Sequence, residues 1–400
     1  MDWKEVSEYF RELPKKFDYL LIIQVLPLLV ISSILVKEIN PDLFQKQLIY
    51  YTVGAIGLTV AAFIPWEKIL WWFAPLSYLI NITLLLAVDL VGKTILGARR
   101  WIEIPGIHMT VQPSEFIKIS VVLMLAFLIN HNPPPEKGYG FKDFAKLSTV
   151  IIIPFLLIAK EPDLGTALVL LLTGYGILFL IGVRWRVWLT VFVLLSISAP
   201  LLYNNLHDYQ KKRIHDFLGK PSYHVQQALI AMGSGGMSGK DKDEATQTQL
   251  KFLPISSSDF IFAYLGERFG FKGMSFVVFV YILLIVHLLA ISRIFAKDYL
   301  IKTVAVGLMF LIFIYMNVNM YMIIGMAPVV GVPLPMFSHG GTSFIIFAIF
   351  FGILLNLMAF KRFFRYNTDT KITMIEKKAH KKLEDTRYRR KNGNTHRMGL

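Results

Sequence analysis

Hydrophobic residues recur along the chain in stretches of about 20 residues, separated by polar connections. A helix of that length crosses the roughly 30 Å hydrocarbon core of a bilayer. The pattern therefore predicts an all-α, polytopic membrane protein with about ten transmembrane helices. The predicted helices cover residues 17–36, 44–64, 69–90, 113–130, 147–159, 163–181, 186–203, 274–295, 300–323 and 342–360.

The fifth stretch is short and contains Pro154. A proline in a spanning helix frees backbone groups that only neighbouring helices can satisfy. We therefore expect this helix to pack in the interior.

The positions of lysine and arginine predict the orientation, because cationic short connections stay on the cytoplasmic side. The N-terminal residues, the connections after the fourth and eighth helices and the C-terminal tail are all basic. We expect a cytoplasmic arm at 1–16, a ten-helix domain at 17–360 and a basic cytoplasmic tail at 361–400. The longest connection, 204–273, is then extracytoplasmic, between the seventh and eighth helices.

Composition agrees with a membrane protein, since 55% of the 400 residues are hydrophobic and 17% are charged. The first apolar stretch is long enough to span and is followed by many more, which distinguishes it from a signal peptide. The net charge of +15 comes mostly from the C-terminal tail, which favours anionic lipid over nucleic acid as its partner. The absence of cysteine excludes disulfides and thiolate metal sites.

Charged residues gather in two clusters at predicted helix ends. Arg99 and Arg100 precede the fourth helix, in which Glu115 and Lys118 lie three residues apart and can pair. Intramembrane charges usually face a cavity, although a structural ion pair and snorkelling arginines are alternatives.

The second cluster contains Glu161 and Asp163, in a short turn between the fifth and sixth helices. Ordinary helix capping explains acids in this position equally well. Their depth at the membrane rim favours a functional site.

Asp259 stands alone among Phe and Ile residues near the end of the long connection. Partial desolvation raises the pKa of such a carboxyl toward that of a general base. The alternative is a helix N-cap. Phosphate-binding loops, HExxH helices and Gly-x-Ser-x-Gly elbows are absent from the sequence, so the enzymes that use them are unsupported.

These segments, taken in order, resemble the SEDS family, the membrane proteins RodA and FtsW that polymerise peptidoglycan. The matching motifs are Gly97 to Trp101, Gln112 to Lys118, Glu161 to Ala167, Gln226 to Gly236, Gln247 to Pro254, Asp259 to Glu267 and Gly331 to Gly341. The segment 328–336 is more similar to RodA, the elongation member, than to FtsW. The sequence departs from the family at Ser256 to Ser258, at Glu267-Arg268, at Gly239 to Asp241 and at His339.

The resemblance implies a peptidoglycan glycosyltransferase of the bacterial inner membrane that polymerises lipid II into glycan strands during elongation and shape maintenance. Asp259 would be the catalytic base, and Glu115, Lys118, Glu161 and Asp163 would line the central cavity. Arg99, Arg100 or Lys118, with a divalent metal (Mg or Mn), would stabilise the leaving pyrophosphate.

The expected partners are a class B penicillin-binding protein transpeptidase and other membrane proteins of the elongation complex. Three alternatives remain open at this point. The chain could be a division-specific FtsW-type polymerase, a transporter that flips lipid II, or a non-catalytic scaffold.

Overall fold

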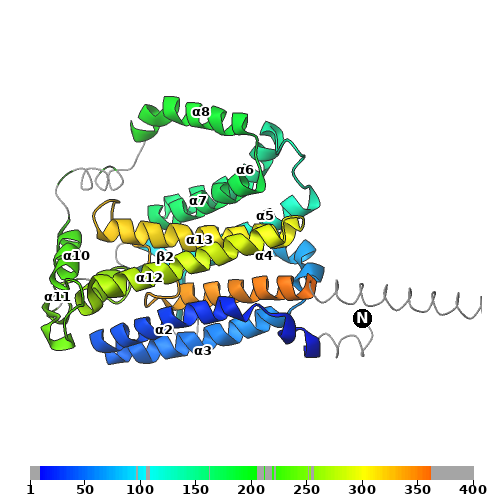
Figure 1. Cartoon of the computed structure of the whole chain (residues 1–400). Helices are drawn as coiled ribbons and strands as arrows, with labels where there is room; N and C mark the ends of the chain where they lie inside the picture. The colour runs from blue at the N-terminus through cyan, green and yellow to red at the C-terminus, as the bar shows by residue number, and fades with distance from the viewer. Residues whose placement is uncertain are drawn as a thin grey trace, which may run out of the picture.

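The computed structural model describes residues 10–95, 98–104, 109–161, 163–204, 211, 219, 222–250, 252–253 and 256–361. Ten helices of 18 or more residues make up most of this part of the chain (Figure 1). They are α2 (Tyr19–Ile39), α3 (Pro41–Phe63), α4 (Trp66–Val91), α5 (Pro113–His131), α6 (Phe141–Lys160), α7 (Leu164–Ile181), α8 (Trp185–Asn204), α12 (Ile261–Ile294), α13 (Tyr299–Ile323) and a C-terminal helix (Gly341–Lys361).

The helix bundle has two distinct ends (Figure 1). At the first, here called the termini end, Leu13 packs against Ala359 and Phe360, and Lys361 Nζ lies 3.0 Å from Asp298 Oδ2. The second, here called the loop end, contains the α2–α3 turn, where the Asn40 side chain accepts a hydrogen bond from the Asp42 backbone N–H, as a helix N-cap does.

A small antiparallel sheet at the loop end was not predicted from the sequence. Its strands are β1 (Lys93–Ile95), β2 (Ala98–Ile104) and β3 (Met109–Val111), in the order β1-β2-β3. The sheet packs on α4 and α5. It therefore holds the Arg99-Arg100 segment as a strand beside the start of α5.

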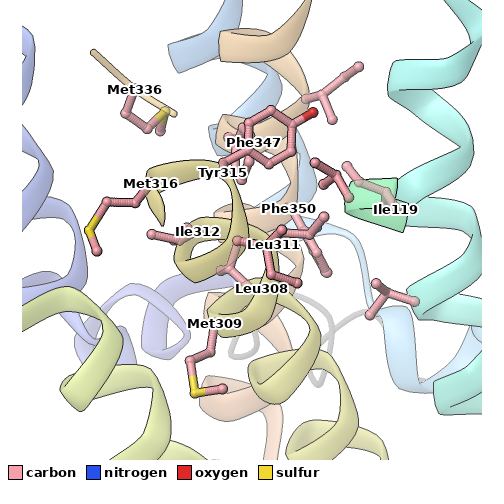
Figure 2. Close-up of a cluster of buried hydrophobic side chains, with 14 of the residues drawn as sticks. Ile119, Leu308, Met309, Leu311, Ile312, Tyr315, Met316, Met336, Phe347 and Phe350 are labelled. Carbon is pink, nitrogen blue, oxygen red and sulfur yellow. The ribbon is translucent and has the colours of Figure 1, made fainter. Parts of the chain in front are cut away.

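Helix α13 lies at the centre of the bundle and packs against α5, α7 and α12. Its buried side chains surround the helix on several sides, as expected for a helix that is hydrophobic all round (Figure 2). Leu308, Ile312 and Tyr315 are buried with Phe347 and Phe350 of the C-terminal helix. Its neighbours thus hold α13 in place, and α13 in turn supports the connections at the loop end.

Helix α12 begins at Ile261, thirteen residues before the predicted start at residue 274. Gly270 has φ 61° and ψ −160°, which breaks the helix into two parts. The first part packs against α10 (Tyr223–Ser234), which the long connection supplies together with α11 (Thr246–Gln249). The sequence pattern missed this segment because it is shorter than a span and is interrupted by glycine.

In the described part of the chain, seven helices meet the length and hydropathy expected of a membrane span: α2, α4 (over Trp66–Val88), α5, α7, α12, α13 and the C-terminal helix. The prediction of a polytopic helical membrane protein is confirmed, whereas the number of ten spans stays a prediction. The expected interior position of the fifth helix is only half right. In α6, Pro154 is buried, but Ile153 and Leu156 on its other face are exposed.

Candidate active site

A cavity of about 560 Å³ opens at the loop end of the bundle. Strand β2, helices α5, α7 and α13, the turn before α12 and the loop 324–340 all contribute to its wall. Its titratable lining residues are Tyr50, Arg100, Glu115, Asp163, Asp259, Tyr315 and His339. Residues of both charged clusters therefore meet Asp259 in one place.

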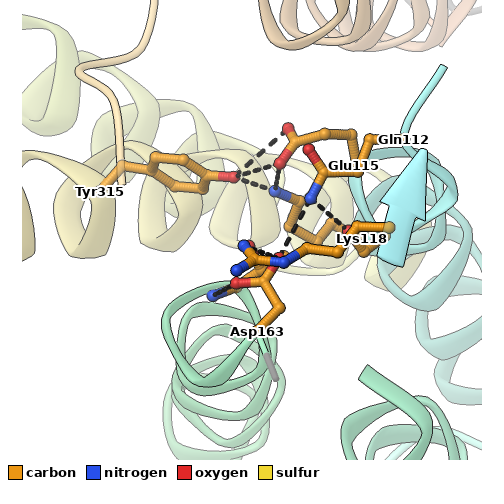
Figure 3. A network of polar contacts seen from close by, with 8 residues as sticks. Gln112, Glu115, Lys118, Asp163 and Tyr315 are labelled. Atoms are coloured by element: carbon orange, nitrogen blue, oxygen red, sulfur yellow. Dashed lines mark hydrogen bonds and ion pairs between the residues drawn. The ribbon is translucent and has the colours of Figure 1, made fainter. Parts of the chain in front are cut away.

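Glu115 and Lys118 form an ion pair on the first turns of α5. Lys118 Nζ lies 2.6 Å from Glu115 Oε1 and also donates to the Tyr315 hydroxyl, as Figure 3 shows. Lys118 is only 3% exposed, and a buried charge is tolerated when it is paired in this way. The pairing expected from the spacing of three is confirmed, and it fixes Glu115 at the cavity wall.

Asp163 caps α7 and also contacts Gln112 and Arg100. Its Oδ1 accepts a hydrogen bond from the Thr166 backbone N–H at 3.2 Å, which caps α7. Its Oδ2 accepts from Gln112 Nε2 at 3.1 Å and lies 3.3 Å from Arg100 Nη1 (Figure 3). Capping and site formation, which the sequence left as alternatives, are therefore combined in one carboxylate.

The other two predicted residues of these clusters, Arg99 and Glu161, are not placed at the cavity by the described part of the structure. Arg99 lies in β2, but its side chain is outside the described part of the structure, as are Gly97 and Pro162. Glu161 is buried at the end of α6 and does not line the cavity. The roles of Arg99 and Glu161 stay predictions.

Asp259 lies in the turn before α12, half-buried between Ser258 and the buried Phe260. Burial raises the pKa of its carboxyl to about 6, and a hydrogen bond with Ser258 lowers it less. Phe260 occupies the N-cap position of α12 with no side-chain cap, so the structure does not support the capping alternative. Within the described residues Asp259 forms no ion pair.

Three further polar residues hold this site together; sequence reasoning named Ser338 only as a motif residue and missed Tyr315 and Asn319. Tyr315 contacts Lys118 and Glu115, and Asn319 and Ser338 hydrogen-bond the backbone around Asp259. Tyr315 and Asn319 lie in the apolar stretch 300–323, where polar side chains are an unusual signal. The sequence thus showed that these polar side chains are unusual, but it did not show which residues they contact.

The cavity carboxylates do not offer a ready set of metal ligands. Glu115 is engaged by Lys118, and Asp163 by Arg100 and Gln112. Among the described residues no group of three or more His, Asp or Glu side chains could hold a metal ion. The donor set thus does not fit a resident divalent metal.

Known proteins are similar to this chain over nearly its whole length. A family model described as cell cycle protein, of the FtsW, RodA and SpoVE type, matches residues 15–363. The peptidoglycan glycosyltransferase MrdB of Helicobacter pylori is 51% identical over 88% of this chain and 92% of its own length. MrdB of Escherichia coli is 38% identical, over 85% and 93%. A probable peptidoglycan glycosyltransferase FtsW of Trichlorobacter lovleyi is 32% identical, over 79% and 83%.

Solved structures share the fold at lower identity. A chain from a peptidoglycan synthase complex that coordinates polymerisation and crosslinking superposes with a TM-score of 0.74, at 24% identity, covering 86% of this chain and 97% of that one. RodA of Thermus thermophilus gives 0.64 at 24% identity, over 86% and 96%. The names of the relatives agree with the enzyme class expected from the sequence. The chain belongs to the FtsW/RodA/SpoVE family, and its greater identity to MrdB than to FtsW relatives favours the RodA-type branch.

Proposed function

We propose that this protein is a RodA-type peptidoglycan glycosyltransferase that polymerises lipid II into glycan strands for cell elongation, with Asp259 as the general base. The observation that carries the proposal is the position of Asp259, a carboxyl of raised pKa at the wall of a 560 Å³ cavity. The names of the MrdB relatives support the reaction class.

The reaction forms one glycosidic bond and breaks one sugar–phosphate bond. The 4-hydroxyl of the terminal GlcNAc on one lipid-linked unit attacks the anomeric carbon of MurNAc on another, with inversion, and undecaprenyl pyrophosphate leaves. The hydroxyl proton passes to the Asp259 carboxylate. With a pKa of about 6, Asp259 is mostly ionised at neutral pH and accepts a proton more readily than an ordinary aspartate.

Arg100 is the cation best placed to stabilise the leaving pyrophosphate. Its side chain lines the cavity, is 25% exposed and is held against Asp163. Lys118 is buried and already engaged by Glu115 and Tyr315, so its charge mainly balances that of Glu115. Preorganised positive charge at the position where negative charge develops lowers the barrier to reaction.

We infer that a divalent metal, Mg or Mn, enters with the substrate pyrophosphate. The carboxylates of the described residues do not supply a preformed site for it. Polymerisation by the purified protein should then depend on the metal and the substrate together, whereas the metal alone should leave the thermal unfolding temperature unchanged. Stabilisation by metal without substrate would contradict this order of binding.

Polymer formation from purified lipid II in detergent tests the function. Asp259→Asn should lower the rate by about 10² to 10⁴, the usual contribution of a general base. Asp241→Asn, an exposed aspartate in the long connection, is the matched control and should retain the wild-type rate. Full activity of Asp259→Asn would refute the assignment, and translocated lipid II without polymer would favour a transporter.

The loop end is proposed to be extracytoplasmic and both termini cytoplasmic, in the bacterial inner membrane. The basic connections lie at the termini end, and the loop 324–340 at the other end contains no lysine or arginine. Because the chain has no cysteine, single cysteines can be labelled selectively. Lys240→Cys should react with a membrane-impermeant maleimide in cells with a permeabilised outer membrane, and Lys137→Cys should not.

A class B penicillin-binding protein transpeptidase is the proposed partner, together with other membrane proteins of the elongation complex. Support comes from the shared fold with a chain of a synthase complex that couples polymerisation to crosslinking. Co-purification of the two full-length proteins after co-expression tests the association. Recovery of the transpeptidase no greater than with an unrelated membrane protein would exclude a stable complex.

A further inference from the structure

One side chain of α13 joins the two segments on the Asp259 side of the cavity. Asn319 Nδ2 donates to the Asp259 backbone oxygen at 2.8 Å and to the Val332 backbone oxygen at 2.7 Å. Asn319 is 0% exposed. The reverse orientation of the amide would place its oxygen against two carbonyl oxygens, so the contacts themselves fix which atom is the donor.

The neighbouring carbonyl groups are held in the same way. Ser338 Oγ donates to the Ser258 backbone oxygen at 2.7 Å, and the His339 backbone N–H donates to the Ser257 oxygen at 3.0 Å. Three successive carbonyl groups, ending with that of Asp259, therefore accept hydrogen bonds from α13 or from the loop before the C-terminal helix. Turning this segment would break all three hydrogen bonds.

The second polar atom of Asn319 indicates why an amide is present. Asn319 Oδ1 is buried and has no hydrogen-bond partner within the described residues. A buried acceptor without a partner is destabilising, and a leucine of similar size would avoid that cost. The contribution of the amide thus lies in its two donated hydrogen bonds.

We propose that Asn319 is a positioning residue for glycosyl transfer, which fixes the backbone of Asp259 to the 331–332 segment so that the carboxylate faces the cavity. The inference rests on the proposed role of Asp259. The same segment forms the wall beside the carboxylate, because a Cβ built on Gly331 would lie 3.5 Å from Asp259 Oδ2. Asn319 therefore fixes both the direction of the Asp259 carboxylate and the position of the 331–332 segment beside it.

Asn319→Leu tests this role at similar size, because a leucine side chain has no N–H to donate and adds no charge beside Asp259. Displacement of a reacting group by about 1 Å can cost 10²-fold in rate, so kcat should fall by about 10- to 100-fold with little change in KM. Asn317→Leu is the matched control, since Asn317 lies on the same helix and donates only to the Phe313 carbonyl. It should retain the wild-type kcat.

The pH profile of kcat separates positioning from general loss of structure. A loosened segment admits water to Asp259, which should shift the acid limb of the profile to lower pH in Asn319→Leu. Unfolding of part of the sample would lower the rate at every pH without moving the limb. The other titratable groups facing the cavity are Tyr50, Arg100, Glu115, Asp163, Tyr315 and His339.

His339 is the neighbour that could be confused with Asp259, because burial and Lys46 lower the pKa of its imidazole. Repeating the profile in His339→Asn assigns the limb. If the limb keeps its position in His339→Asn, it belongs to Asp259. If the limb disappears in His339→Asn, it does not report Asp259, and the positioning inference fails.

The outcomes distinguish this inference from the proposed function. An inactive Asp259→Asn together with a wild-type kcat and limb in Asn319→Leu would overturn the role of Asn319 alone. An active Asp259→Asn would instead overturn the base. If Asn319→Leu does not fold, Ser338→Ala decides, because it removes the donor to the Ser258 carbonyl. It should lower kcat by about threefold to tenfold and move the same limb, and wild-type behaviour would refute the inference.

Discussion

Asp259 and Glu267 lie close together in sequence at the start of α12, yet their surroundings differ. Glu267 is 0% exposed, and its two oxygens accept hydrogen bonds from the Gln247 N–H at 2.9 Å and from the N–H and hydroxyl of Thr248 at 3.2 and 2.8 Å. Asp259 is half-buried at a cavity and forms no ion pair within the described residues. A carboxylate with satisfied acceptors stabilises the fold, whereas one lacking them can accept a proton from a substrate.

Arg268, the residue after Glu267, also stabilises the fold, through contacts with Glu38. Arg268 Nε and Nη2 lie 2.8 and 2.9 Å from the two oxygens of Glu38, and the Tyr264 hydroxyl donates to Glu38 at 2.7 Å. Arg268 Nη1 also donates to the Lys240 carbonyl. The departure from the family at Glu267-Arg268 is thus matched by an acid on α2, and the Glu38–Arg268 pair fastens the long connection to the bundle.

Glu267→Ala should produce the largest loss of stability. The change leaves two backbone N–H groups and one hydroxyl buried without an acceptor, which should lower the free energy of unfolding by about 3 kcal/mol. Thermal unfolding of the purified protein in detergent measures the effect. Asp259→Asn is the comparison variant and should unfold at or above the wild-type temperature. Equal stability of Glu267→Ala and wild type would remove the distinction between the two carboxylates.

Arg268→Glu should cost about 2 kcal/mol, because it sets two partly buried carboxylates against each other. The exchange Glu38→Arg with Arg268→Glu restores opposite charges and should recover more than half of that loss. The double-mutant cycle measures the coupling by thermal unfolding. Lys272→Glu, an exposed reversal on the same helix, is the control. A swapped protein no more stable than Arg268→Glu would show that the pair does not fasten the loop.

Local patterns carried most of what the sequence predicted. Hydrophobic stretches predicted the long helices, and a spacing of three on one helix predicted the Glu115–Lys118 pair, now seen at 2.6 Å. The order of the motifs predicted the family, which the comparisons confirm. In each case the informative residues lie within a few turns of one another or keep a fixed order.

Contacts between distant segments could not be predicted in this way. Asn319 and the Asp259 carbonyl are 60 residues apart, and Glu38 and Arg268 are 230 apart. The start of α12 at Ile261 was missed because Gly270 interrupts the helical pattern. Sheet β1–β3 was missed because β1 and β3, with three residues each, are too short for a period of two to be recognised.

The pH dependence of Asp259 gives the smallest predicted effect and the finest test of the comparison. Burial raises the pKa of Asp259 from 3.8 to about 6, and a base must be deprotonated to act. The polymerisation rate should therefore fall as the pH drops through 6, by about tenfold between pH 7 and pH 5. Buffers of constant ionic strength and a fixed substrate concentration above KM isolate this step.

Stability should respond to the same carboxyl in the opposite direction. Because the pKa of Asp259 is higher in the folded protein than in the unfolded chain, the folded state holds the proton more tightly between about pH 4 and pH 6. The contribution of Asp259 to stability is fully present below pH 4 and is lost as the pH rises through 6. Unfolding temperatures of wild type and Asp259→Asn should therefore diverge above pH 6 and converge at low pH, while a constant difference would show that burial does not set the pKa of Asp259.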